Sequence, residues 1–518
     1  MMQWIQATCV FAVALGVCGT SPAAGEDEPS ARPNVVLMMA DDVGWSDLGS
    51  YGSEIRTPNL DRLAQQGLSF TQFYNMAKCE TTRATLLSGL MQPRAHAKRA
   101  QALPALMRQA GYYTAVSGKE HFMEWVPKHF SFAETFDDSF FFPLVTEYFV
   151  PPDGTFNEPF YLNGQRIDPE DMDLSQRPFY KTDAITDYAL QFLNKAKDTK
   201  KPFFLYLPYH AAHYPLQARE EDIARYEGKY ADGWDALRER RFARQKELGV
   251  LPPGAKLSPP SDNIYPHRGG KEYAKYTPWD QTPQSDRADL AREMAVYAAM
   301  IDRLDQNIGR VLKHLEATGA ADNTLVIFLN DNGGCPFDNG TADRETGGPI
   351  GSAGSYEYLH PEWACATNTP WRYFKQYGHE GGCRTPLIAR WPCKIKPGRT
   401  DQIGHVADIM PTMLQLAGTH YPDTVQGQPT PELDGESLLP IFEGKQWEEP
   451  RFLISGRGGD KRMVRLGDWK IVRAKNRPWE LYNMTDDPAE LDNLADEHPD
   501  KVQTLAKRYR QWLKNADP

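Results

Sequence analysis

The sequence lacks a basic surplus, internal repeats, low-complexity tracts and, beyond its N-terminus, any long apolar run. Its 58 lysines and arginines are outnumbered by 69 aspartates and glutamates, which leaves a formal net charge of −11. Because binding to phosphate backbones needs a basic surface, nucleic acid is excluded as the main partner. Without a long internal apolar run, no later segment is expected to span a membrane.

Basic side chains are also absent from the first six residues, although the N-terminus otherwise has the pattern of an export signal. An apolar run from Ala7 to Gly19 is followed by small residues through Ala24. Such a run is short for a membrane span, so residues 1–25 predict a cleaved signal peptide and a secreted or periplasmic protein. Lipid attachment at Cys18 is the less favoured alternative, because the residues before it match a lipoprotein signal poorly.

Cysteine is scarce, with seven residues in 518. Removal of the leader would take Cys9 and Cys18, and five would remain. Export to an oxidising compartment permits disulfides, but the sequence does not determine any pairing. Apart from Cys79, the cysteines open to pairing are Cys335, Cys365, Cys383 and Cys393.

Short apolar runs alternate with helical patterns from residue 34 to about 418. This pattern predicts an α/β fold with a large, mostly parallel sheet sandwiched by helices. The expected strands cover residues 35–39, 113–117, 203–207, 325–330 and 387–391, and the expected helices include 103–110 and 294–315. After Leu439 the chain changes to short strand-like pieces and a closing helix over residues 500–515. We therefore expect a signal peptide (1–25), a catalytic domain (26–439) and a C-terminal subdomain (440–518).

Two stretches interrupt the alternating pattern, residues 219–285 and 340–370. Long irregular loops in compact domains are often functional, so both are expected to form the lips of a pocket. The first contains a charged helix over residues 235–247, whose arginine-rich face is interpreted as a solvated surface. Farther along, His405 and Asp408 lie in a helix-like run and are expected to be structural.

Polar residues follow four of the expected strands. Because parallel strands bring their carboxyl ends to one edge of a sheet, these side chains are expected to converge into a site. Four of them, all oxygen donors, suit a hard divalent cation, although each short motif alone could be a simple turn. These oxygen donors are Asp41, Asp42, Asp331 and Asn332, and the other residues at strand ends are Lys119, His121 and His213.

Cys79 and Arg83 are spaced four residues apart where a loop is expected to enter a helix. This spacing puts both side chains on one helical face. A thiol at a helix start beside a guanidinium would be acidified, exposed and reactive. The alternative from spacing alone is a small buried cysteine with a surface arginine.

Together these motifs resemble the type I sulfatase family of the alkaline phosphatase superfamily, whose Cys-x-Pro-x-Arg cysteine is oxidised to formylglycine. The chain departs from that family at Thr81, a position that the maturation enzyme reads, and at Glu120, where many relatives have tryptophan. The matching motifs, in order, are Asp41-Asp42-Val43-Gly44, Thr57-Pro58-Asn59-Leu60-Asp61-Arg62-Leu63, Cys79-Glu80-Thr81-Thr82-Arg83, Gly118-Lys119-Glu120-His121, Ala212-His213-Tyr214-Pro215, Asn330-Asp331-Asn332-Gly333-Gly334, Lys375 before His379-Glu380-Gly381-Gly382, and Glu480-Leu481-Tyr482-Asn483.

The resemblance implies a role for each matching residue. Cys79, as a formylglycine hydrate, would be the nucleophile and would bind a metal through one of its oxygens. By analogy that metal is calcium rather than magnesium, with the four oxygen donors as its other ligands. The remaining implied roles are orientation of the hydrate by Arg83, its support by Lys119, proton removal by His121, protonation of the departing oxygen by His213, and clamping of sulfate by Lys375.

The implied function is hydrolysis of an aryl or carbohydrate sulfate ester. The implied partners are a sulfated small molecule or glycan and a formylglycine-generating maturation enzyme. The resemblance also implies that the C-terminal subdomain is an antiparallel sheet with a helix. Two alternatives stay open: a phosphomonoester or phosphodiester hydrolase of the same superfamily, and a catalytically silent protein that binds sulfated glycans. The sequence determines neither the natural substrate nor the oligomeric state.

Overall fold

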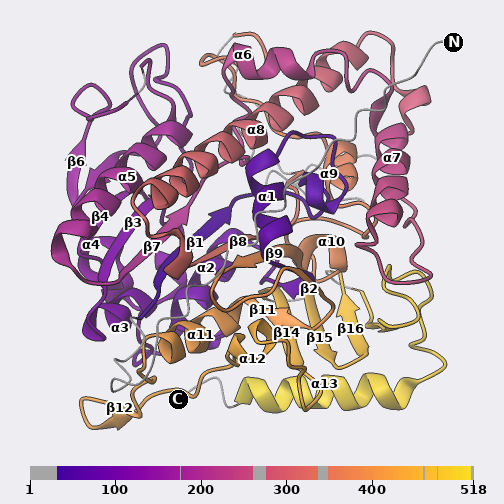
Figure 1. Cartoon of the computed structure of the whole chain (residues 1–518). Helices are drawn as coiled ribbons and strands as arrows, with labels where there is room; N and C mark the ends of the chain where they lie inside the picture. The colour runs from indigo at the N-terminus through magenta and orange to yellow at the C-terminus, as the bar shows by residue number, and fades with distance from the viewer. Residues whose placement is uncertain are drawn as a thin grey trace, which may run out of the picture. The chain divides into compact units, whose positions relative to one another are not determined.

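The centre of the fold is a mixed, mostly parallel sheet (Figure 1). The computed structural model describes residues 32–175, 177–260, 276–336, 348–458, 461–474 and 477–514, so the expected signal peptide lies outside it. Five neighbouring strands of the sheet are parallel, which confirms the expected fold class. In sheet order they are β8 (Thr324–Asn330), β1 (Asn34–Ala40), β7 (Phe203–Pro208), β3 (Tyr113–Lys119) and β4 (Asp138–Phe142).

The two sides of the sheet carry additional strands, most of which the sequence pattern did not indicate. On one side β9 (Arg384–Arg390) runs antiparallel to β8 and to β2 (Leu68–Tyr74). The strand expected at 387–391 starts three residues earlier, at Arg384. The sequence pattern did not indicate this start because Arg384 and Thr385 are polar, although the fold buries them. The remaining strands of this sheet are β10 (Gly398–Thr400), β11 (Gly404–His405), β5 (Phe160–Leu162) and β6 (Gln165–Ile167).

Alternation along β1 explains how the sheet is covered on both faces. Val36 and Met38 pack into one apolar cluster, with α5 and α8, whereas Val35 and Leu37 pack into a second, with α3 and α11. Successive side chains of a strand point to opposite faces, so a continuous apolar run forms a strand buried on both sides. The helices are α1 (Pro58–Gln66), α2 (Cys79–Ser88), α3 (Leu103–Gln109), α4 (Phe132–Thr135), α5 (Lys181–Thr199), α6 (Glu220–Ile223), α7 (Gly233–Leu248), α8 (Arg287–Ala317), α9 (Pro361–Thr367), α10 (Glu380–Cys383), α11 (Ile409–Leu416), α12 (Leu439–Phe442) and α13 (Pro499–Lys514).

Helix α7 confirms the charged helix expected at 235–247 but corrects the interpretation of its arginine-rich face. Arg238 and Arg241 are buried. The Arg241 guanidinium donates to Asp47 Oδ1 at 2.6 Å and to both carboxylate oxygens of Glu54 at 2.9 Å. The face is therefore only partly solvated, because a long cationic side chain can be buried when carboxylates pair with it.

The C-terminal residues form a separate antiparallel sheet, as the resemblance implied. Its order is β14 (Phe452–Gly458), β15 (Lys461–Leu466), β16 (Trp469–Arg473) and β17 (Glu480–Asn483), and α13 packs against β15 and β16. Ile454, Val464, Ile471 and Leu481 share one apolar cluster with the main sheet. The domain boundary at residue 439 stays a prediction, because Pro33–Pro518 form one compact unit.

Three further expectations can be compared with the described residues. No helix among them is long and apolar enough to cross a membrane. Cys79, Cys383 and Cys393 form no disulfide with any residue that the structure describes. His405 is structural, as expected: it begins a short helical turn, where its Nδ1 accepts from the Ala407 N–H and Asp408 accepts from its own N–H.

Candidate active site at the carboxyl edge of the sheet

The carboxyl ends of four neighbouring parallel strands meet at one edge of the sheet, in the order β8, β1, β7, β3. Asp331 and Asn332 follow β8, and Asp41 and Asp42 follow β1. Lys119 is the last residue of β3, and β7 leads into the loop that carries His213. The convergence expected from the sequence is therefore present.

The oxygen donors at this edge are arranged as a cation site would require. Carboxylate oxygens of Asp41, Asp42 and Asp331 lie within 4.8 Å of one another. Asp41 Oδ1, Asp42 Oδ2 and Asn332 Oδ1 are buried and make no hydrogen bond to any described residue. Burying such oxygens without a partner is unfavourable, and a hard divalent cation binds them well. These residues fit a divalent metal.

The electrostatics of the carboxylates support the same interpretation. Burial and the neighbouring Asp41 charge together raise the pKa of Asp331 to about 7. Burial would also raise the pKa of Asp41, but the charges of Lys119 and Arg83 lower it well below its usual range. The side chains therefore leave Asp331 short of positive charge, which a bound cation would supply.

Arg83 links the ends of three strands inside the site. It is fully buried, and its Nη2 donates to Asp331 Oδ2 at 2.9 Å and to Asp41 Oδ2 at 3.2 Å. Its Nη1 donates to the Lys119 carbonyl at 3.2 Å. One planar guanidinium thus holds the ends of β8, β1 and β3 together, and the surface arginine considered from spacing alone is wrong.

Cys79 starts α2 on the face of that helix that also carries Arg83, but its thiol is neither exposed nor acidified. Burial raises its pKa to about 11, against the opposing charge of Lys375. Desolvation of the thiolate therefore outweighs the helix dipole and the nearby cations, which corrects the expectation of a reactive thiol. Its sulfur lies within 4.8 Å of ligand atoms of Asp41 and His213.

Threonines in the first turn of α2 fix the segment around Cys79. The hydroxyl of Thr81 is buried and donates to the Lys78 carbonyl at 3.1 Å. The hydroxyl of Thr82 donates to the Asp331 carbonyl at 2.6 Å and accepts from the Met76 N–H at 3.0 Å. Thr81 therefore fits the fold as a short polar residue that bonds to its own loop.

Lys119 and His121 both reach the site, Lys119 from the end of a strand and His121 from the turn after it. Lys119 Nζ donates to Asp41 Oδ2 at 2.6 Å. Strand β3 ends there, and His121 has a positive φ of 38°. Its Nδ1 is buried and makes no hydrogen bond to a described residue, and burial together with Lys119 lowers its pKa. A turn, and not alternation along a strand, thus aims this imidazole.

His213 and Lys375 approach Asp42. The Nδ1 of His213 lies 2.8 Å from the Tyr214 carbonyl, and its Nε2 lies 3.4 Å from Asp42 Oδ2. Because Nδ1 donates to that carbonyl, Nε2 is the nitrogen that faces the site. Lys375 Nζ donates to Asp42 Oδ1. The pKa of His213 is lowered mainly by burial, and the charges of Lys119 and Lys375 lower it further.

Two supporting residues carry no distinct signal in the sequence. His210 is buried, and its ring lies 4.9 Å from that of His213, centroid to centroid. Tyr297, from the buried middle of α8, places its hydroxyl 2.9 Å from the Asp42 carbonyl. Both residues look like ordinary core side chains in the sequence, since only the tertiary fold brings them to the site.

A cavity of about 450 Å³ opens beside the two site histidines. Among the described residues it is lined by charged, polar, aromatic and aliphatic side chains from six segments of the chain. They are Lys78, Glu80, Glu120, His121, Phe122, Met123, Glu124, Trp125, Pro143, Leu144, Val145, Asn157, Glu158, His213, Tyr214 and Tyr356.

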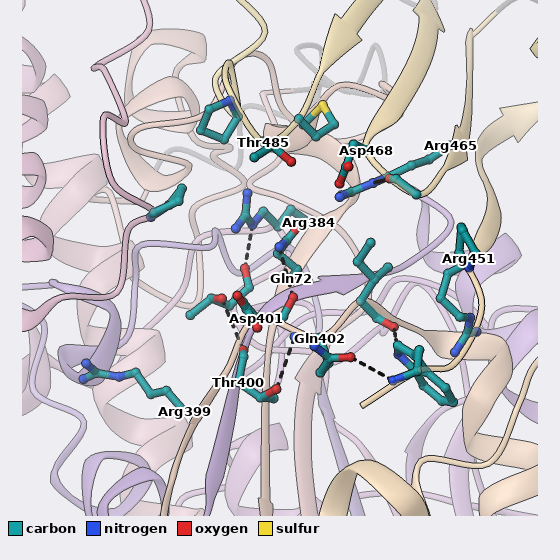
Figure 2. A pocket seen from close by; sticks show the side chains of 18 of the residues that line it. Gln72, Arg384, Arg399, Thr400, Asp401, Gln402, Arg451, Arg465, Asp468 and Thr485 are labelled. Atoms are coloured by element: carbon teal, nitrogen blue, oxygen red, sulfur yellow. Dashed lines mark hydrogen bonds between the residues drawn. The ribbon is translucent and has the colours of Figure 1, made fainter. Parts of the chain in front are cut away.

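A second, wider cavity of about 910 Å³ lies between the β2–β10 edge and the C-terminal sheet (Figure 2). None of the expected site residues lines it. Arg384 from β9 and Arg465 from β15 project into it, but Arg384 already bonds to Glu380 and stacks on the Trp371 ring at 4.0 Å. The chemistry expected from the sequence therefore belongs to the smaller cavity.

Comparison with known proteins agrees with this fold and site. A family model described as Sulfatase matches residues 33–419. A second model, described as N-sulphoglucosamine sulphohydrolase, C-terminal, matches residues 370–517. The two matches together extend from the first strand of the main sheet to the last helix.

Relatives resemble the chain over most of its length. An uncharacterized sulfatase of Schizosaccharomyces pombe is 34% identical, with 93% of each chain covered. An arylsulfatase of Klebsiella aerogenes is 31% identical, with 84% of this chain and 96% of the relative covered. The crystal structure of Ps i-CgsB has a TM-score of 0.66 at 24% identity and covers 94% of both chains, and it too has this fold.

The mixed sheet with acidic residues at its carboxyl edge is a fold that the crystal structure of PsFucS1 sulfatase also has, with a TM-score of 0.57 at 20% identity. The family match covers well over half of the residues, and relatives above 30% identity cover nearly the whole chain. The chain belongs to the sulfatase family, hydrolases that act on sulfate esters. Members of this family generally use formylglycine and a divalent metal.

Proposed function

We propose that this chain hydrolyses the sulfate monoester of a phenol or a sugar at the carboxyl edge of its sheet, with Cys79 as the precursor of the nucleophile. The position of Cys79 carries the proposal. Its sulfur lies at the start of α2, within 4.8 Å of ligand atoms of Asp41 and His213. A nucleophile placed between a cation site and an imidazole suits attack on a charged ester.

The metal and the modified cysteine would together supply the electrophilic and nucleophilic chemistry of the site. Asp41, Asp42, Asp331 and Asn332 would hold a divalent cation, with calcium favoured over magnesium by analogy, and its charge would act as a Lewis acid. Oxidation of Cys79 to formylglycine would replace a poorly ionised thiol with an oxygen nucleophile.

Arg83, Lys119 and Lys375 would have different roles in stabilising negative charge. Arg83 is engaged by Asp41 and Asp331, so it positions the acidic cluster and the start of α2. Lys119 and Lys375 each bond to a single carboxylate through one of their three N–H donors, which leaves further donors for sulfate oxygens. Fixed cations of this kind stabilise the charge that grows on those oxygens during transfer.

Two imidazoles are placed for proton transfer. His213 is held by its Nδ1 contact with the Tyr214 carbonyl, so Nε2 is the atom that faces the departing oxygen. Burial lowers the pKa of this imidazole in the free protein, and the negative charge of a bound sulfate would favour the imidazolium, whose Nε2 proton would pass to that oxygen. His121 lies near the sulfur of Cys79, on the side of the cavity, and its buried Nδ1 makes no hydrogen bond to any residue that the structure describes. It would remove a proton from the nucleophile when sulfate is released.

The burial of Cys79 sets the order of maturation. Its side chain is 0% exposed in the folded chain, and no enzyme active site could reach it there. The maturation enzyme would therefore oxidise Cys79 before folding, in a chain destined for export to the periplasm or beyond. Thr81 would be read in that unfolded segment.

The decisive experiment compares aryl sulfate with aryl phosphate. The full chain is produced together with a formylglycine-generating enzyme, and release of 4-nitrophenol from the two esters is measured under one condition. Preference for the sulfate is expected. A preference for phosphate would indicate the phosphoester hydrolase. No turnover of either ester, combined with an unmodified Cys79 thiol in peptide mass spectra, would favour the glycan-binding alternative.

A further inference from the structure

We infer that the 450 Å³ cavity selects leaving groups that carry no second anionic group. The inference rests on the proposed function, because it concerns the alcohol or phenol part of the ester. Neutral and cationic leaving groups are accepted, and carboxylated or doubly sulfated ones are rejected.

The location of the cavity identifies it as the leaving-group pocket. His213 and His121 both line it, and neither Lys119 nor Lys375 does. If His213 Nε2 protonates the departing oxygen, the rest of the leaving group extends from that atom into the cavity. Its volume is enough for a single sugar or phenyl ring and short of a long oligosaccharide.

Aromatic walls make the pocket suitable for a ring. Phe122 and Trp125 come from the segment after His121, and Tyr214 follows His213 directly. Tyr356 lies near Tyr214, with their ring centroids 6.4 Å apart. Flat apolar faces of this kind pack on the face of a sugar or an aryl group without requiring charge.

The charge of the lining is the feature that discriminates. Four glutamates line the cavity, namely Glu80, Glu120, Glu124 and Glu158. Among its described lining residues Lys78 is the one lysine or arginine, and its Nζ lies 3.6 Å from Glu80 Oε2. One cation thus faces four carboxylates, so the lining has an excess of negative charge.

The site therefore has two electrostatic halves. Lys119, Lys375 and Arg83 gather where the sulfate group binds, and carboxylates gather where the leaving group binds. A substrate with one sulfate matches this arrangement, because its single charge lies at the cationic end. A second anion on the leaving group would be placed against carboxylates. Such like-charge contacts discriminate between substrates by weakening the binding of the doubly charged one, and they leave the binding of the singly charged one unchanged.

The test uses two aryl sulfates that differ in one charge, 4-acetylphenyl sulfate and 4-carboxyphenyl sulfate. The quantity measured is the ratio of kcat/KM for the carboxylated ester to that for the neutral one. Glu124→Gln, Glu158→Gln and the double variant remove one or two charges from the lining. Comparing each variant with the wild type cancels the different intrinsic reactivities of the two esters.

The ratio is expected to rise by about threefold for each carboxylate removed, as for charges repelling across a partly solvated pocket. Glu239→Gln is the matched control, because Glu239 is an exposed glutamate on α7 outside the cavity, and its ratio should stay at the wild-type value. An unchanged ratio in the double variant, with both esters hydrolysed, would overturn the inference alone. Failure of the wild type to hydrolyse either ester would instead contradict the proposed function.

Discussion

At the scale of single residues, the site is organised around a cysteine that the fold protects from solvent. Cys79 is fully buried and its pKa is raised, so the thiol itself is a poor nucleophile at neutral pH. Because burial disfavours the thiolate, Cys79 needs modification before this position can supply a good nucleophile.

Replacement of Cys79 by alanine is expected to reduce hydrolysis of 4-nitrophenyl sulfate to the background rate. The cavity left by one sulfur atom is small, so the thermal transition and the far-UV circular dichroism should change little. Cys393→Ala is the matched control, because Cys393 is exposed and lies outside the site. Activity that survived in Cys79→Ala would remove formylglycine from the mechanism.

Asp331→Asn tests the proposed metal site at one atom. The substitution keeps the shape of the side chain but removes a ligand charge and the ion pair with Arg83. We expect calcium content, measured by atomic emission after dialysis, to fall well below that of the wild type, with activity that excess calcium restores only in part. Asp322→Asn, at an exposed aspartate, should bind metal normally. Full activity in a metal-free Asp331→Asn protein would contradict the site.

The residues that sequence motifs could predict are those whose chemistry is unusual for their position. Adjacent carboxylates at a strand end and a lysine two residues before a histidine stand out in a sequence, and the fold brings them together. Arg241 and Tyr297 do not stand out, because a helical arginine or tyrosine is ordinary until tertiary structure buries it. Spacing alone left a buried Cys79 as one of two alternatives, because its burial depends on segments far away in the chain.

At the scale of elements, four of the five parallel strands and most of β9 were predictable, whereas β4, β2 and the short flanking strands were not. Strands such as β1 and β8 are buried on both faces, so their apolar runs are continuous. Strand β2 contains serine, threonine and glutamine among its apolar residues, and β9 begins with buried polar residues. Their positions are determined by pairing with each other, which the local pattern does not encode.

Helix α7 offers a comparison between two neighbouring arginines. Arg241 is buried against Asp47 and Glu54, whereas Arg240 forms an exposed pair with Asp232. We expect Arg241→Ala to lower the free energy of unfolding by about 3–5 kcal/mol, because the buried Asp47 and the half-buried Glu54 lose their cation. Arg240→Ala should lower it by no more than about 1 kcal/mol. Urea denaturation measures both, and similar losses would show that the buried pair contributes little.

The helical turn that starts at His405 should make stability depend on pH. Burial and the charge of Arg451 lower the pKa of His405 from its ordinary 6.5 to about 3. Between these values the unfolded chain binds a proton that the folded chain does not, so stability falls as the pH drops from about 6.5 towards 3. The slope contributed by this residue approaches about 1.4 kcal/mol per pH unit.

His405→Asn removes that titration while an amide oxygen keeps the hydrogen bond from the Ala407 N–H. The free energy of unfolding from urea curves at pH 5 and pH 7 should therefore differ less in the variant than in the wild type. His420→Asn, at an exposed histidine, should retain the wild-type difference. An equal difference in all three proteins would show that His405 does not titrate in this window.

At the scale of the whole molecule, the C-terminal sheet is joined to the main sheet by a buried polar cluster as well as by apolar packing. Lys470 on β16 places its Nζ 2.6 Å from Glu380 Oε1 and 2.7 Å from Glu490 Oε1. Glu380 also accepts from Arg384 on β9 and from Tyr74 on β2. A cation from the C-terminal sheet thus pairs with Glu380, a carboxylate that residues of the main sheet hold in place, close to the loop that carries Lys375.

Lys470→Ala tests whether the two sheets unfold together. Removal of the cation leaves Glu380 and Glu490 buried with less compensation, so we expect a loss of about 3–5 kcal/mol in the free energy of unfolding. Lys445→Ala, at an exposed lysine paired with Glu443, should change it by no more than about 1 kcal/mol. Because Ile454 and Val464 share an apolar cluster with β1, calorimetry should still show one cooperative transition, shifted to lower temperature. Two separated transitions in the wild type would instead show that residues 440–518 unfold as an independent domain.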